Sequence, residues 1–218
     1  ATPAESVERI VDSAAATDVV GITSALADTL QEWGVVGAWT NVVAPALEHV
    51  TERVEKGELG LEVAVVLRER VEVELRSVAR AFAPRFVGGR PVVLAALDGG
   101  AEALAVLALE AALAGKGVAA VSLGFDVPCE ALAGLLRRIT PAAVYLWTTA
   151  EDGARDVVLA AMETATPTTI LLGGGGWSTI ADDVAEMARD GVEVEPAPDL
   201  PATADLLFER VRAAPTVR

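Results

Sequence analysis

Cys129 is the most chemically distinctive side chain of this sequence, because the chain has no other cysteine. It comes directly after Pro128, at the expected start of a helix. The N-terminus of a helix lowers the pKa of a cysteine and so favours the thiolate. Two interpretations of Cys129 stay open: an inert core residue, and a thiol to which a cofactor is attached covalently.

Four glycines and two tryptophans are expected close to the Cys129 loop. The glycines occupy residues 173–176, between an apolar run and a segment of helical periodicity, and Trp177 follows them. Gly173 and Gly174 would let a ligand approach the backbone, and a helix N-terminus favours an anion. A turn that packs against its neighbour is the other explanation. Trp147 ends the preceding apolar run, so Trp147 and Trp177 are expected to border one crevice, as an aromatic wall for a flat ligand or as side chains that fill it.

The histidine and cysteine counts exclude several kinds of site. One cysteine excludes an internal disulfide and a cysteine-rich metal site, and one histidine excludes a zinc site built from clustered histidines. His49 follows Glu48 on a predicted helix, where we expect an interhelical or surface residue that is also the only imidazole available to a metal. No Ser/His/Asp or Cys/His pairing supports hydrolysis. We therefore do not expect an enzyme.

The elements that position these residues alternate regularly after residue 88. Five apolar runs of strand length are each followed by a segment of helical periodicity, which predicts a flavodoxin-like, doubly wound α/β domain with a five-stranded parallel sheet. The expected strands are 91–97, 118–123, 142–148, 168–172 and 192–195, and the expected helices are 101–114, 127–138, 151–164, 177–190 and 202–212. Ligands of such sheets bind at the carboxyl ends of the strands, so we expect the site beside Asp98-Gly99-Gly100 and the Cys129 loop.

Residues 1–87 predict a four-helix bundle with short loops. The expected helices are 6–15, 21–33, 34–54 and 61–82. Pro45 predicts a kink or an offset start within the third helix. Trp33 and Trp39 have the spacing of core residues on the bundle. Gly88-Gly89 is the expected linker, so we predict a helical bundle over 1–87 and a Rossmann-like domain over 88–218.

The net charge of −15 argues against direct contact with a nucleic acid, because phosphate binding needs lysine and arginine. No apolar run reaches the roughly 18 residues that a membrane-spanning helix needs, and the first residues do not have the pattern of a signal peptide. We therefore expect a cytoplasmic protein without membrane contact.

Four short motifs point to a known family. They are Val-Glu-Lys-Gly-Glu-Leu-Gly at 54–60, Gly-Lys-Gly-Val at 115–118, Leu-Gly-Phe-Asp-Val-Pro at 123–128, and Gly173-Gly174. Together with the order of bundle and sheet domain, they resemble the cobalamin-binding modules of methionine synthase and, more closely, the light-sensing CarH/LitR repressors of the MerR type. The resemblance covers nearly the whole chain. It implies a corrin between bundle and sheet domain, with its nucleotide tail in the crevice.

The side chains that this family uses for cobalamin are replaced in the sequence. The family's Asp-x-His-x-x-Gly motif supplies the histidine below cobalt, and an ungapped count back from 116–117 puts Glu102 in its place. Trp147 stands where the tail-binding motif has a serine, and it would fill the tail slot. Trp39 with His49 is similar to the bundle motif of the repressors, but it is one residue too short and lies earlier. The resemblance therefore disfavours cobalamin with a protein histidine on cobalt.

A slot without those side chains suits a flat tetrapyrrole that has neither metal nor tail, and we favour a bilin, biliverdin, attached to Cys129. Glu102 or Asp126 would face its pyrrole nitrogens, and its propionates would need arginines. The arginine candidates are Arg53, Arg68, Arg70 and Arg85. The remaining expected ligand-binding residues are Phe125, Trp147, Gly173, Gly174, Trp177, Trp39 and His49.

This hypothesis makes the chain a sensory, light-responsive part of a MerR-type transcriptional regulator. Light would alter its self-association, as the resemblance implies, and the DNA-binding helices would precede Ala1. Two other classes stay open besides a cobalamin-binding light sensor. One is a cofactor-free interaction module in which Trp147, Trp177 and valines fill the pocket. The other is a corrinoid carrier for methyl transfer.

Overall fold

The computed structural model describes residues 1–82, 90–152, 154–164, 168–177 and 191–214. The chain forms two compact units, Ala1–Ala81 and Phe82–Arg218. The predicted linker Gly88-Gly89 lies outside the described residues, so its position as a boundary stays a prediction.

The first unit is helical, as predicted. It contains α1 (Pro3–Ala15), α2 (Val19–Ala38), the π-helix η1 (Trp39–Val43), α3 (Ala44–Glu55) and α4 (Leu61–Ala81). Their apolar stripes meet in a core that includes Ile10, Ile22, Leu26, Leu67 and Leu75. Burial of these side chains stabilises the unit, since each contributes about 1.5–3 kcal/mol of hydrophobic free energy.

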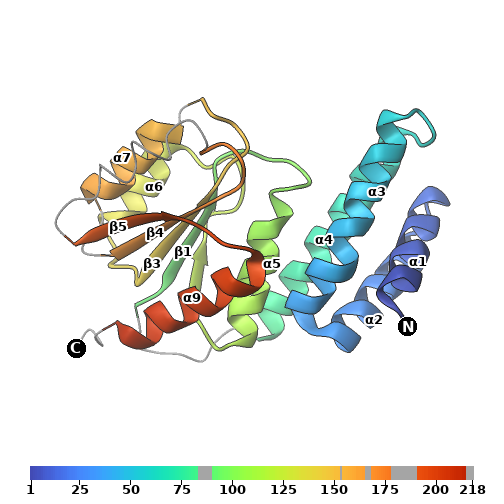
Figure 1. Ribbon diagram of the computed structural model, residues 1–218, viewed down its shortest axis with the longest axis horizontal. Helices are drawn as coiled ribbons and strands as arrows, with labels where there is room; N and C mark the ends of the chain where they lie inside the picture. Colours follow the sequence, from blue (N-terminus) through green and yellow to red (C-terminus); the bar gives the residue numbers. More distant parts are fainter. Residues whose placement is uncertain (83–89, 153, 165–167, 178–190, 215–218) are drawn as a thin grey trace. The chain divides into compact units, whose positions relative to one another are not determined.

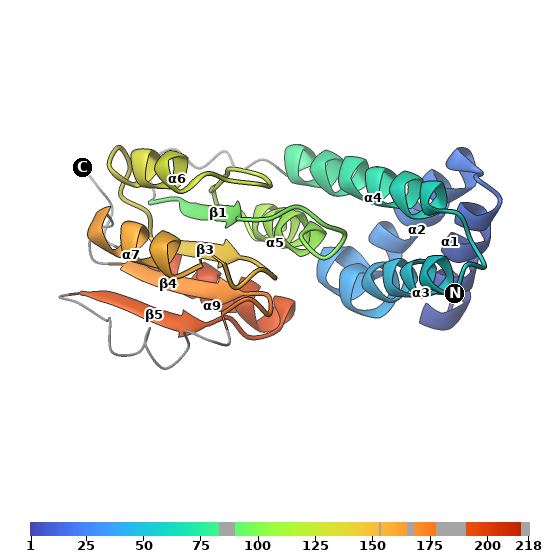
Figure 2. The same ribbon diagram turned by 90° about the horizontal axis from the view of Figure 1, so that it is seen from above.

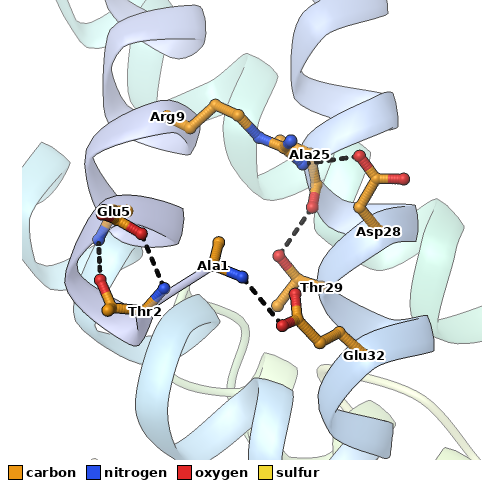
Figure 3. Close-up of polar contacts among 8 residues, drawn as sticks. All are labelled: Ala1, Thr2, Glu5, Arg9, Ala25, Asp28, Thr29 and Glu32. Atoms are coloured by element: carbon orange, nitrogen blue, oxygen red, sulfur yellow. Dashed lines mark hydrogen bonds and ion pairs between the residues drawn. The ribbon is translucent and has the colours of Figure 1, made fainter.

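Polar contacts cap the N-terminal end of α1 and link α1 to α2, which packs beside it (Figure 3). Thr2 and Glu5 form a capping box, in which the Glu5 amide donates to Thr2 Oγ1 at 3.2 Å and the Thr2 amide donates to Glu5 Oε2 at 2.8 Å. Arg9 pairs with Asp28 across the two helices at 2.9 Å. Both partners of that pair are exposed, so it contributes at most about 1 kcal/mol.

Gly34 and Pro45 interrupt the helices of the first unit where the sequence predicts a break and a kink. Gly34 lies within α2 at φ 65° and ψ 173°, a non-helical conformation in the region that favours glycine. Pro45 has no N–H to donate to a preceding carbonyl. The turn before it widens to a π-helix, in which the Ala44 amide donates to the Trp39 carbonyl five residues back.

The second unit contains a parallel sheet in the order β2-β1-β3-β4-β5, the flavodoxin-like order that the sequence predicts. Its strands are β1 (Val92–Ala96), β2 (Ala120–Ser122), β3 (Ala143–Trp147), β4 (Thr168–Gly173) and β5 (Val192–Pro196). Figure 2 shows the labelled strands running in one direction. The carboxyl ends of the strands therefore meet at one edge.

Helices cover both faces of this sheet. The faces carry α6 (Cys129–Leu136) and α7 (Ala154–Thr164) on one side, and α5 (Leu104–Gly115) and α9 (Leu200–Ala213) on the other (Figure 1). The predicted helix 177–190 lies outside the described residues except for Trp177. No helix in the described ranges is long and apolar enough to cross a membrane.

Alternation along the strands decides which side chains face which helices. Val144 and Leu146 of β3 belong to the core beneath α6 and α7. Because side chains alternate along a strand, Tyr145 and Trp147 point to the face that α5 and α9 cover. Tyr145 and Trp147 are both buried, at 7% and 5% exposure.

Candidate functional site

The site suggested by the topology lies between the loops that follow β1 and β3. These strands are neighbours in the sheet, while β2 extends it on one side and β4 and β5 extend it on the other. Ligands of open α/β sheets bind at such a switch point, outside the carboxyl ends of the strands. Here the loop after β1 contacts the end of β3, because the Leu97 amide donates to the Trp147 carbonyl at 2.9 Å.

Asp98 links the two loops through one carboxylate oxygen. Its Oδ2 accepts from the amides of Thr149 and Ala150 at 2.8 and 3.0 Å, and the hydroxyls of Thr148 and Thr149 lie 3.0 Å from the same atom. These partners follow Asp98 by 50 to 52 residues. The carboxylate therefore clamps the β1 loop to the β3 loop at the switch point.

The two oxygens of Asp98 have different surroundings. Oδ1 is buried and has no hydrogen-bond partner in the part of the chain that the structure describes. Desolvation raises the pKa of Asp98, but the hydrogen bonds from Thr149, Ala150 and Thr148 outweigh it and hold that pKa below its ordinary value. Asp98 is therefore ionised at neutral pH, with one oxygen satisfied and the other without a donor.

The glycines after β4 are explained in part by the packing of this loop against the β3 loop. Gly174 has φ +86°, and a Cβ there would lie 2.2 Å from the Thr148 carbonyl oxygen. A Cβ on Gly176 would lie 2.4 Å from the Ala150 carbonyl oxygen, whereas one on Gly175 would meet nothing within 4 Å. The Gly176 amide also donates to the Thr148 carbonyl at 3.0 Å. Two of the four glycines thus allow close backbone contact, which supports the packing explanation.

Trp147 and Trp177 do not form one aromatic wall. Trp177 is 5% exposed and belongs to the core beneath α6 and α7, with its indole Nε1 donating to the Gly173 carbonyl at 2.6 Å. Trp147 faces the opposite side of the sheet. The expectation that both border one crevice is therefore wrong, because the alternation of the strand sends Trp147 away from Trp177. A Cβ on Gly173 would lie 2.0 Å from the Tyr145 hydroxyl, so Tyr145 fills the space beneath this glycine.

Cys129 begins α6, as predicted, but its environment opposes a thiolate. The side chain is half-buried and packs against the core beneath α6 and α7. Burial raises the pKa of the Cys129 thiol, and the carboxylates of Glu130 and Asp156 raise it further. The expected lowering of this pKa is thus wrong, because desolvation and two negative charges outweigh the helix N-terminus.

The predicted carboxylates at this edge lie in exposed loops. Asp126 has φ +52°, a left-handed conformation uncommon outside glycine, and its Oδ2 lies 2.8 Å from the position of a Cβ on Gly99. The structure therefore brings Asp126 to the loop that carries Asp98. Phe125 is half-buried in the same loop as Asp126, and Glu102 is exposed in the turn before α5.

The candidates on the first unit are divided between core and surface. Trp39 is buried in the helical core, at 8% exposure, and His49 is exposed on α3. Two of the arginines proposed for propionates pair with neighbouring glutamates, Arg53 with Glu58 at 3.2 Å and Arg70 with Glu69. Arg68 is half-buried on α4, and Arg85 lies outside the described residues.

The sequence predicts this edge of the sheet but not its central contact. The expected site includes Asp98-Gly99-Gly100, but the sequence pattern assigns no contact to Asp98, Thr148 or Thr149. An aspartate directly after a buried strand, with two threonines after the next strand in the sheet, was the available signal. Within the described ranges, no group of three or more histidine, cysteine, aspartate or glutamate side chains is arranged to hold a metal ion.

Comparison with known proteins gives a match in fold but not in sequence. No family model matches the chain, and no curated protein matches it in sequence. Among solved structures, the monomethylamine corrinoid protein of Methanosarcina barkeri aligns with a TM-score of 0.67 at 16% identity, over 95% of this chain and 99% of that chain.

Two further structures align less well. The methanol:cobalamin methyltransferase complex of Methanosarcina barkeri gives a TM-score of 0.47 at 14% identity, over 98% of this chain and 82% of that chain. A cobalamin-binding protein of Desulfitobacterium hafniense DCB-2 gives 0.43 at 14% identity, over 94% and 98% of the two chains. The first alignment carries the conclusion. The chain has the fold of the monomethylamine corrinoid protein, helices followed by a five-stranded parallel α/β domain, as the resemblance in its motifs predicts.

Proposed function

We propose that this chain is a corrinoid-binding domain of the carrier type, which presents its cofactor to a methyl-transfer partner and is not itself the catalyst. The observation that carries the proposal is the similarity in fold to a corrinoid protein over 95% of this chain and 99% of the other. A similarity confined to the sheet would be weak support, since many unrelated ligands bind to flavodoxin-like sheets. Here it includes the helical part as well.

The charges at the carboxyl edge favour a corrinoid over a bilin. Asp98 is an ionised carboxylate at the switch point, Asp126 lies against the neighbouring Gly99, and the chain carries a net charge of −15. Carboxylates repel the propionates of a bilin. The rim of a corrinoid carries amides in place of free carboxylates, and amide N–H groups donate to carboxylates.

The residues of this edge do not fit coordination of cobalt by a protein histidine. The only histidine of the sequence is His49, which lies exposed on α3 of the first unit. The loop after β1 offers Asp98, Gly99 and Gly100, and none of them carries an imidazole. The proposal therefore concerns binding and presentation of the cofactor, with no protein histidine on cobalt.

The bilin hypothesis loses its main motivation in the structure. It required a reactive thiol, but Cys129 packs against a core and has a raised pKa. It also required arginines for the propionates, and Arg53 and Arg70 already pair with glutamates. Membership of a MerR-type regulator and a response to light stay predictions from the sequence resemblance.

A cofactor-free interaction module is the second candidate. The observation in its favour is that Tyr145 and Trp147 are buried on the α5 and α9 face of the sheet. In addition, Asp98 joins the loops after β1 and β3 by hydrogen bonds. Side chains that fill this face of the sheet leave less room for a nucleotide tail than an open crevice would. This packing does not exclude a ligand that lies outside the loops.

Uptake of cofactor by the purified chain separates these candidates. The protein should carry a tag without histidine, because an added imidazole would supply the missing cobalt ligand. After incubation with methylcobalamin or with biliverdin, each sample is passed over a size-exclusion column and its visible spectrum is recorded. Co-elution of the corrinoid supports the carrier, and a denaturation-resistant bilin band supports the photoreceptor. Colourless protein from both incubations contradicts both and selects the interaction module.

A further inference from the structure

The unpartnered oxygen of Asp98 is the strongest sign of a ligand contact in this molecule. Oδ1 is buried and has no donor among the described residues, although four donors surround Oδ2. A buried oxygen of an ionised carboxylate without a hydrogen bond is costly, so a water, an ion or a ligand is expected to supply the donor that the described residues do not.

The position of Asp98 is that of a ligand contact. It is the second residue after β1, at the switch point of the sheet, where ligands of this architecture bind. The hydrogen bonds to Oδ2 fix the carboxylate in one orientation, so Oδ1 is held in place before any ligand arrives. A fixed acceptor loses little conformational entropy on binding.

The surroundings of this loop leave room for a neutral donor and disfavour an anion. A Cβ on Gly100 would meet nothing within 4 Å, so space is open two residues after Asp98. The carboxylate of Asp126 lies against Gly99, the residue between Asp98 and Gly100. Two negative side chains near one loop repel a ligand carboxylate, whereas an amide N–H can donate to either of them.

We propose that Asp98 Oδ1 is a ligand-binding acceptor that takes a hydrogen bond from an amide N–H on the rim of the bound corrinoid. This inference rests on the proposed function. Asp98 would thereby distinguish a corrin whose side chains are amides from one whose side chains are free carboxylates.

The variant that tests this contact is Asp98→Asn. An asparagine has the same shape and keeps an amide oxygen for the donors of the β3 loop. It places an NH₂ group, a donor, where Oδ1 was, so it would meet the ligand N–H with the wrong polarity. Asp152→Asn is the matched control, because Asp152 is exposed in the loop after β3 and loses the same charge at the same edge.

The probes are cobinamide, which has an amide rim and no nucleotide tail, and cobyrinic acid, which has a carboxylate rim, both with the same axial ligands on cobalt. We expect the wild type and Asp152→Asn to prefer cobinamide. We expect Asp98→Asn to bind cobinamide about ten-fold or more weakly, the range for a lost hydrogen bond to a charged group, and to lose most of the preference. Equal affinity of Asp98→Asn and wild type for cobinamide overturns this inference and leaves the proposed function intact. Failure of the wild type to bind either corrinoid overturns both.

A second measurement does not depend on the folding of a variant. The carboxyl carbon of Asp98 in the wild-type protein is titrated by NMR with and without saturating cobinamide. A hydrogen bond donated to Oδ1 stabilises the ionised form, so bound ligand should lower the pKa of Asp98 further. An unchanged pKa in the saturated protein would overturn the inference.

Discussion

Gly174→Ala should destabilise the second unit strongly. The substitution places a Cβ on a residue at φ +86°, which costs about 1–2 kcal/mol for a residue other than glycine. The same Cβ would lie 2.2 Å from the Thr148 carbonyl oxygen, a backbone atom that cannot rotate away. Relief of this clash moves the loop and weakens the 3.0 Å hydrogen bond from the Gly176 amide to the same carbonyl, at a further cost of about 1 kcal/mol.

These effects together predict a loss of roughly 3 kcal/mol, a large fraction of the 5–15 kcal/mol of a typical domain. Gly175→Ala is the matched control, because a Cβ there meets nothing within 4 Å and its φ is not in the positive range. We expect the control to stay within about 0.5 kcal/mol of wild type. Urea unfolding gives the free energies, and amide hydrogen exchange at Thr148 and Gly176 localises the change. Equal stability of the two variants would refute the view that these glycines serve loop packing.

Three further predictions concern Asp98, Trp177 and Cys129. The pKa of Asp98 is lowered in the folded state, so its contribution to stability is present above the unfolded pKa of about 3.9 and is lost as pH falls through the folded value. The free energy of unfolding should therefore fall more steeply with decreasing pH for the wild type than for Asp98→Asn. Parallel pH profiles of the two proteins would contradict this. Trp177→Phe removes the indole donor at 2.6 Å from the Gly173 carbonyl, which still accepts from the Thr148 amide at 3.1 Å. Urea unfolding should therefore show a free energy of unfolding about 1 kcal/mol lower than that of the wild type. An unchanged free energy would argue against this hydrogen bond. The Cys129 thiol has a raised pKa, so its alkylation by iodoacetamide should reach half-maximal rate at a higher pH than that of free cysteine, and a lower midpoint would revive covalent attachment.

The fold follows from the sequence to within a few residues, because apolar runs and glycines mark most element ends. Two of the differences lie in the second unit. The second strand is predicted over 118–123 but spans only Ala120–Ser122. The helix predicted from residue 101 starts at Leu104, because the amides of residues 103–106 each donate to the carbonyl three residues back, which forms turns before the α-helix.

The site was less predictable, because its contacts join residues far apart in the sequence. Asp98 meets donors 50 to 52 residues later, and no local pattern reveals which of its oxygens they occupy. The thiol of Cys129 is affected by Asp156, which lies on the next helix. The faces of Trp147 and Trp177 depend on strand alternation and on the path of the loop after β4. Their positions in the sequence, after the third and fourth strands, predict the edge of the sheet for both tryptophans but not the face on which each lies.

Electron paramagnetic resonance of bound cob(II)alamin tests the central claim most directly. The chain is prepared with natural nitrogen and with nitrogen-15, loaded with cob(II)alamin and freed of unbound cofactor. A protein imidazole on cobalt would change the nitrogen splitting between the two preparations, whereas cofactor bound without a protein histidine gives the same spectrum in both. Our account predicts retained cobalt and identical spectra; a splitting that depends on the protein isotope, or protein without cobalt, would contradict it.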